Sequence, residues 1–160
     1  MGFDLEIVIA SVQVAERVAS VFGHGVPLVS LEQGLAFVPF TGAVHDALTA
    51  PQDEKIAGFW KLPHTVADLL AALSTAGPVA YAELDYFGGA GRQAAMVWDA
   101  GELVWGPRVL DVNQPIPHEG TPVSSALRRL GVVAAQGLDE FDTVGLRLHR
   151  HMEPWETDED

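Results

Sequence analysis

The sequence predicts a single α+β domain, in which an antiparallel sheet with a C-terminal three-strand meander is packed by about four helices. Its 160 residues, 48% of them apolar, suit one domain with a hydrophobic core. Apolar residues recur with the period of a strand in some segments and of a helix in others. Three strand-like segments follow one another between residues 79 and 105, and such a meander favours an antiparallel sheet. We expect this domain to span residues 1–152, followed by an acidic, flexible tail at residues 153–160.

A strand and a helix are expected at the N-terminus. Residues 3–10 alternate between two faces, and Asp4 and Glu6 share a face with Val8. Ser11 can then accept a hydrogen bond from the first turn of a helix that ends at Gly23. The apolar positions of this helix follow helical spacing: Val14, Val18 and Val21.

Two short strands, a segment without a clear pattern and a second helix are expected next. The strands lie at residues 28–31 and 35–40, and residues 41–61 are expected to form a short helix and a loop. Residues 65–68 are typical of the start of a helix, and Gly77-Pro78 would end it. The buried side of this helix is expected to contain Leu69, Leu70 and Leu73.

The predicted meander contains strands at residues 79–87, 92–98 and 102–105, with a tight turn at residues 99–101. In its first strand Glu83 and Asp85 share a face with Tyr81. If a helix covered that face, the two carboxylates would need partners or raised pKa values. A face open to water is more common, so we expect both to be ordinary surface acids.

The C-terminal third is predicted to contain a long loop and two helices. The loop covers residues 107–120, and Thr121-Pro122 opens a helix that Gly131 ends. Asp139 is expected to cap the last helix, which would place Phe141, Val144 and Leu148 on one side. If that helix is continuous, Asp142 and His149 share a face, because they are seven residues apart.

Composition excludes several classes of function. The chain has 22 acidic and 9 basic residues, a net charge of −13, and no cysteine. Disulfide and thiolate chemistry are therefore excluded, and nucleic-acid binding is not expected because no cluster of basic residues could neutralise phosphates. No apolar run is long enough for a membrane span. Acids near the N-terminus do not suit a signal peptide, so a cytoplasmic location is expected.

The glycine-rich segment after residue 85 is the most unusual part of the sequence. Gly89-x-Gly91-x-x-Ala94 matches a dinucleotide-binding pattern, but that pattern must open a helix, and strand-like residues follow here. These glycines are typical of a hairpin connection or a bulge. Alternatively, they allow a ligand or a partner to approach the backbone closely. The candidate contact residues are Tyr86, Gly88, Gly89, Gly91, Arg92 and Gln93.

The sequence contains no complete catalytic or metal-binding pattern. Asp142 and His149 are the candidates for an acid/base pair. His149-x-His151 supplies too few ligands for zinc, so neither a metal nor a cofactor is expected. No serine lies in a nucleophile elbow. A site with paired carboxylates stays possible, but the sequence does not locate it.

Two motifs stand out in the second half of the chain. The first is Tyr86-Phe87-Gly88-Gly89-Ala90-Gly91-Arg92-Gln93, followed by a tryptophan and an acidic-glycine turn. The second is Ser125-Ala126-Leu127 with Leu130-Gly131-Val132, then Asp139-Glu140-Phe141-Asp142, continued by Gly145-Leu146 and His149-Arg150. Together they resemble a family of small bacterial proteins from actinobacteria and firmicutes that has no established activity. The resemblance covers residues 79–151 and implies that the glycine-rich segment and the Asp139–His149 segment belong to one unit, so we expect them to meet in space.

Three functions remain open. The first is a protein-binding module that docks a basic partner, for example an immunity-type protein that neutralises a cationic toxin. The second is an enzyme or small-ligand binder with a site between residues 88–93 and residues 139–149. The third is a self-associating structural protein in which the meander pairs across a dimer axis. The strong acidity favours the protein-binding module. The enzyme is less favoured because no catalytic pattern is complete.

Overall fold

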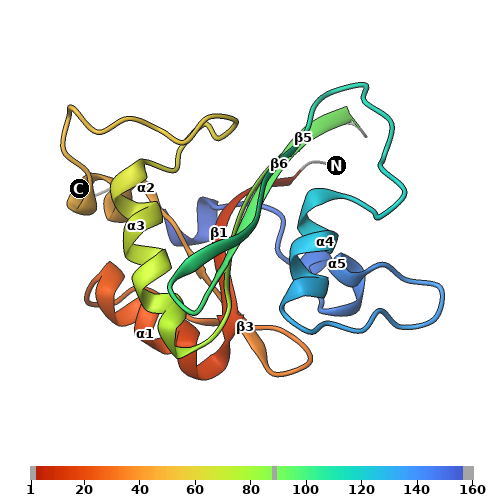
Figure 1. Cartoon of the computed structure of the whole chain (residues 1–160), viewed down its shortest axis with the longest axis horizontal. Coiled ribbons are helices and arrows are strands. Elements are labelled where there is room, and N and C mark those ends of the chain that lie inside the picture. The colour runs from red at the N-terminus through yellow and green to blue at the C-terminus, as the bar shows by residue number, and fades with distance from the viewer. Residues whose placement is uncertain (1–2, 88–89, 157–160) are drawn as a thin grey trace.

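The computed structural model describes residues 3–87 and 90–156 of the chain. Within them, one six-stranded sheet lies between two layers of helices (Figure 1). All five strand pairings are antiparallel, which confirms the predicted α+β class. Within the described part of the chain, no helix has the length and the apolar character needed to cross a membrane.

The sheet has the strand order β2-β3-β1-β4-β5-β6, and its last three strands are the predicted meander. Strand β1 is central because it pairs with β3 on one side and with β4 on the other. The pairing with β4 sets Glu6 directly opposite Glu83. The strands are β1 (Phe3–Ser11), β2 (Val29–Ser30), β3 (Leu35–Pro39), β4 (Val79–Phe87), β5 (Ala90–Asp99) and β6 (Glu102–Leu110).

Side-chain caps begin most of the helices. Ser11, Thr121 and Asp139 accept hydrogen bonds from backbone N–H groups three residues ahead, as the sequence predicted, and Thr41 does the same. The helix expected to start at residues 65–68 begins instead at His64, after Pro63, which makes no side-chain cap. The helices are α1 (Val12–Phe22), α2 (Gly42–Leu48), α3 (His64–Leu73), α4 (Pro122–Arg129) and α5 (Glu140–Thr143).

Each face of the sheet has its own hydrophobic core. Side chains such as Val8, Tyr81 and Met96 pack against α1 and α3. The alternate residues, such as Ile7 and Val97, pack against the layer that contains α4. Two predicted stripes need correction. In α1, Val21 is exposed and Phe22 is buried in its place. In α3, Leu70 is buried as predicted, but Leu69 and Leu73 are only partly buried, and Val66 and Ala67 complete the buried side.

The C-terminal segment is not the continuous helix that the sequence predicted. Helix α5 ends at Thr143, and Gly145 adopts a left-handed conformation with φ 93° before a short 3₁₀ turn. This break turns the chain, so Leu148 is 75% exposed and does not join Val144 in the core.

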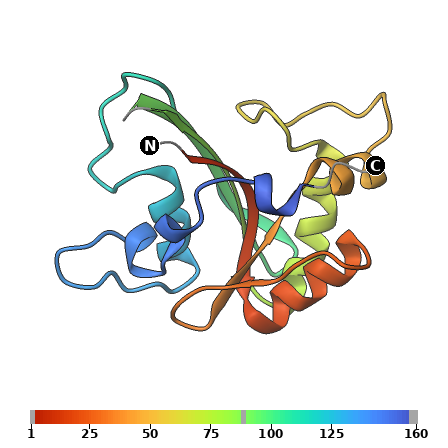
Figure 2. The same cartoon turned by 180° about the vertical axis from the view of Figure 1, so that it is seen from behind.

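Beyond this break the chain crosses the sheet toward α2 (Figure 2). Backbone hydrogen bonds join Asp4 to Arg150 and Met152, and the side chains of Asp4 and His151 are also in contact. Residues 153–156, which were expected to be flexible, are held against the body. The ring of Trp155 meets that of Phe37, and Glu156 accepts hydrogen bonds from the backbone of Gly42. Residues 157–160 of the expected tail lie outside the described residues.

Candidate functional site

The two segments singled out in the sequence meet at a hollow of about 200 Å³. Strand β4 contributes Leu84 and Tyr86 on the face that packs against α4, and β5 contributes Gln93. The second segment contributes Asp139 and Phe141 from the start of α5. We call this hollow the Tyr86 pocket. Its remaining lining residues are Phe3, Ile116 and Thr121.

Gln93 holds the polar side of the Tyr86 pocket in place. Its Oε1 accepts a hydrogen bond of 3.0 Å from the backbone N–H of Val123, at the start of α4. Its Nε2 donates a hydrogen bond of 3.1 Å to the hydroxyl oxygen of Tyr86. Burial raises the pKa of Tyr86 and the hydrogen bond from Gln93 opposes this rise, so the phenol stays protonated at neutral pH.

Two further candidates from the glycine-rich segment do not contribute to this pocket. Arg92 lies on the opposite face of the sheet, where its guanidinium pairs with Asp111, donates to the carbonyl of Gly58 and stacks over Trp60. The space beside Gly91 is filled by the backbone of the neighbouring strand β4. A Cβ on Gly91 would lie 2.4 Å from the carbonyl oxygen of Asp85. Gly88 and Gly89 lie outside the described residues.

The structure does not bring the proposed acid/base pair together. Asp142 lies in α5, and its backbone N–H donates to the capping Asp139. His149 lies beyond the break at Gly145. Its ring stands edge-on to that of Phe37, with the ring centroids 5.3 Å apart, and burial lowers the pKa of the imidazole. The described residues contain no hydrogen bond or ion pair between Asp142 and His149. They also contain no group of three or more His, Asp or Glu side chains arranged to hold a metal ion.

A pair of carboxylates, one buried and one partly buried, lies on the other face of the sheet, where the sequence could not locate it. Glu83 is fully buried and Glu6 is its direct cross-strand neighbour. Trp60 and Lys61 donate side-chain hydrogen bonds of 3.1 and 3.3 Å to Glu6. The expectation that Glu83 is a surface acid is therefore wrong, whereas Asp85 is exposed as expected.

Glu83 anchors the segment before α3 to the sheet. Its Oε1 accepts from the backbone N–H of Trp60 at 2.7 Å, and its Oε2 from those of Lys61 and Leu62 at 3.0 Å. The hydroxyl of Tyr81 donates to Oε2 at 2.8 Å. Because Glu83 is fully buried and already accepts four hydrogen bonds, its carboxylate is closed to a substrate. We therefore interpret Glu83 as a structural residue.

The pKa of Glu83 is expected to make stability depend on pH. Burial raises this pKa from 4.5 to about 7. Between these values the folded protein binds a proton that the unfolded chain has lost. The free energy of unfolding is therefore expected to fall as the pH rises from about 4.5 to about 7. Urea unfolding across this range measures the fall. Glu83→Gln has no titrating group here, so it should show a smaller fall, and equal falls in both proteins would contradict the assignment.

Acidic residues gather along α3, which covers the face of the sheet opposite to the Tyr86 pocket, and at the β5–β6 turn beyond the end of α3. Glu54 lies at the start of α3, because its carbonyl accepts from the backbone N–H of His64. The turn between β5 and β6 lies at its end, where Ala100 and Gly101 donate to Ser74. We call this surface the acidic face. Its acids are Asp53, Glu54 and Asp68 beside α3, and Asp99 and Glu102, which pair with each other at the β5–β6 turn.

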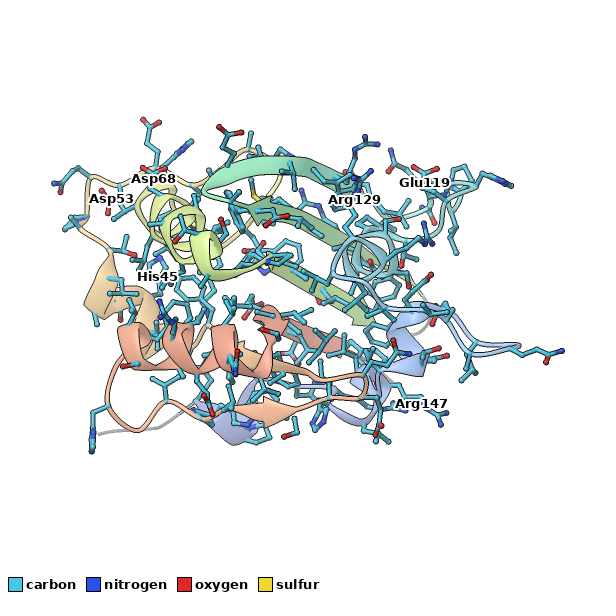
Figure 3. The ribbon with its side chains drawn as sticks, turned by 60° about the horizontal axis from the view of Figure 1, so that its bottom comes forward. His45, Asp53, Asp68, Glu119, Arg129 and Arg147 are labelled. Carbon is cyan, nitrogen blue, oxygen red and sulfur yellow. The ribbon has the colours of Figure 1, made fainter. Side chains whose placement is uncertain are left out.

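The charge of the chain is unevenly distributed. Residues 1–104 contain twelve acids and four basic residues, whereas residues 105–152 contain five of each. Among the described residues, none of the acidic-face carboxylates forms an ion pair with Lys or Arg. Figure 3 shows Asp53 and Asp68 at the α3 side of the molecule, with Arg129 and Glu119 at the opposite side.

Comparisons of the chain with protein-family models, with curated proteins and with solved structures find no match.

Proposed function

We propose that this chain is a protein-binding module that docks a basic partner on its acidic face. The observation that carries this proposal is the group of five carboxylates along α3 and the β5–β6 turn, without ion pairs to Lys or Arg in the described part of the chain. Carboxylates in such a group raise the local negative potential and speed the approach of a cationic protein. An immunity-type protein that neutralises a cationic toxin is one form of such a module.

Exposed apolar residues beside these acids support the same surface. Leu103 and Val104 directly follow Glu102 and are 47% and 50% exposed. Leu103 is paired with Trp98, so its side chain is on the same side of the sheet as α3. Protein interfaces commonly combine an apolar centre with a polar, charged rim. Leu103 and Val104 would supply apolar contact, and the carboxylates would supply orientation.

Self-association through the meander is a less favourable alternative. Strand β6 is the outer strand, but Pro107 lacks an N–H group and the register between β5 and β6 shifts at two places. Proline and bulges are devices that blunt sheet edges against pairing. Light scattering tests this alternative, since a dimer at tens of micromolar would revive it.

Neutralising part of the acidic face is expected to weaken partner binding about tenfold. The variant carries Asp68→Asn, Asp99→Asn and Glu102→Gln, and each exposed ion pair lost costs roughly 0.2–1 kcal/mol. The tagged protein first captures a partner from lysate of the cells that make it. Mass spectrometry identifies the partner, and surface plasmon resonance at low and moderate salt then measures its affinity for both proteins.

The control variant removes the same net charge elsewhere. It carries Glu16→Gln, Glu32→Gln and Asp85→Asn, all at exposed positions without ion pairs to Lys or Arg in the described chain. We expect its affinity to change by less than about threefold, because surface charges away from a contact act mainly on the association rate. If both variants lose the same affinity for the partner, the effect comes from the net charge of the chain and not from a contact at the acidic face. A captured partner without excess positive charge would overturn the proposal.

A further inference from the structure

We infer that the Tyr86 pocket binds a small uncharged molecule that combines an apolar body with one hydrogen-bond acceptor, such as a ketone. This inference is independent of the acidic face, whose residues beside α3 lie on the other side of the sheet. The hydroxyl group of Tyr86 would donate the hydrogen bond to the ligand, and its neighbours determine where its hydrogen can point.

The amide of Gln93 determines what Tyr86 can offer to a ligand. The backbone N–H of Val123 needs an acceptor, so the oxygen of the Gln93 amide must face Val123. Its NH₂ group then faces Tyr86 and donates to the phenol oxygen. The hydroxyl of Tyr86 is thus the acceptor in this bond, and its own hydrogen is available. Within the described residues no hydrogen bond uses that hydrogen, so it can donate into the pocket.

The other polar side chains of the pocket already serve the helices. Thr121 accepts from the backbone of Ser124 at the start of α4, and Asp139 accepts from that of Asp142 at the start of α5. The carboxylate of Asp139 also places negative charge at the pocket wall. An anionic ligand would be repelled by this charge. A cationic ammonium group has no lone pair for the Tyr86 hydrogen. An uncharged acceptor, such as a carbonyl oxygen, fits both conditions.

Apolar walls provide for the rest of the ligand. Phe3, Leu84 and Phe141 line the pocket, and the rings of Phe3 and Phe141 meet edge to face at 5.5 Å. Ile116 lies at the pocket and is 66% exposed, although it is apolar. It also lines a neighbouring hollow of about 220 Å³ that shares Tyr86. Binding sites for small molecules typically combine such apolar walls with a few oriented polar groups.

Four probes with the same benzene ring test the inference. They are acetophenone, which carries an acceptor, cumene, which has a similar shape without one, benzoate and benzylammonium. Each is titrated into the whole chain, and nuclear magnetic resonance follows the backbone amides of Phe3, Leu84 and Phe141. We expect acetophenone to bind about threefold to tenfold more tightly than cumene, as one neutral hydrogen bond provides. Benzoate and benzylammonium should shift these amides less than acetophenone at equal concentration.

Tyr86→Phe removes only the hydroxyl group and should remove the preference for acetophenone over cumene. The matched control is Tyr81→Phe, which deletes the same atom on the opposite face of the sheet and should keep the preference. Circular dichroism checks that both variants fold. If Tyr81→Phe does not fold, Arg108→Gln serves as the control, because Arg108 lies on the edge strand β6. A preference that survives in Tyr86→Phe would overturn the inference. Equal affinities of the two probes for the unmodified chain, or no shift at these amides, would also overturn it.

Discussion

Replacement of Glu83 by alanine is expected to lower the free energy of unfolding by about 4 kcal/mol, the largest effect of any substitution considered for this protein. The change removes the acceptor of three backbone N–H groups and of the Tyr81 hydroxyl, in a place that is closed to water. Each buried donor left without a partner costs roughly 1–3 kcal/mol. The total is smaller than the sum for four donors, because the backbone can shift and give some of them new partners. Urea unfolding at neutral pH, followed by tryptophan fluorescence, measures the loss.

Asp85→Ala is the matched control for this prediction. Asp85 lies two residues further along β4, on the same side of the strand, but it is exposed. We expect its substitution to change the free energy of unfolding by less than about 0.5 kcal/mol. Hydrogen exchange gives a second readout, because the amides of Trp60, Lys61 and Leu62 should lose protection in Glu83→Ala before those of the central strand. A loss below about 1 kcal/mol would show that Glu83 does not anchor this segment.

Much of the fold could be predicted because its signals are local. The turn after Asp99 and the caps at Ser11 and Asp139 depend on a few neighbouring residues, and each lies where the sequence placed it. The meander follows from two short connections, since strands joined in this way pair with each other. The error in the last helix is also local. Glycine commonly ends a helix, and Gly145 ends this one before the spacing of Asp142 and His149 can place them on one face.

The burial of Glu83 could not be predicted because it depends on a distant segment. Residues 49–63 have no helical or strand period, so the sequence did not indicate which face they cover. Their backbone N–H groups supply three of the four hydrogen bonds to Glu83. A signal was nevertheless present in the strands. Glu6 shares a strand face with Val8, and Glu83 shares one with Tyr81, so each carboxylate stands on a face that also carries large apolar residues. When the two strands pair, these faces form one surface and bring the two carboxylates together.

The candidate site was predicted in part. Tyr86 and Gln93 share a face of the sheet and meet the segment that contains Asp139, as the two motifs suggested. Arg92 could not belong to the same site, because successive residues of a strand point to opposite faces. Its neighbour Gln93 occupies the pocket side, and Arg92 stacks over Trp60 on the other.

Replacement of Gly91 by alanine is expected to cost about 2 kcal/mol and to open the sheet locally at the Tyr86 pocket. The added Cβ would lie 2.4 Å from the carbonyl oxygen of Asp85 and 2.5 Å from the Cα of Tyr86. Both are backbone atoms, so no side-chain rotation relieves the clash, and β4 and β5 must separate there. The cost stays moderate because Gly91 lies near the end of β5, where few pairs have to open.

Hydrogen exchange and urea unfolding together test this prediction. The amides of Leu84, Tyr86 and Gln93 should exchange faster in Gly91→Ala, whereas those of α1 should keep their protection. Gly131→Ala is the contrasting control: Gly131 has φ 99° with no atom within 4 Å of an added Cβ. There the cost is backbone strain of about 1 kcal/mol, without any effect on the pocket. Unchanged exchange at Tyr86 in Gly91→Ala would mean that the two strands tolerate a side chain between them. Faster exchange confined to residues around Gly91 would show that the glycine maintains the close strand pairing on which the position of the Tyr86 hydroxyl depends.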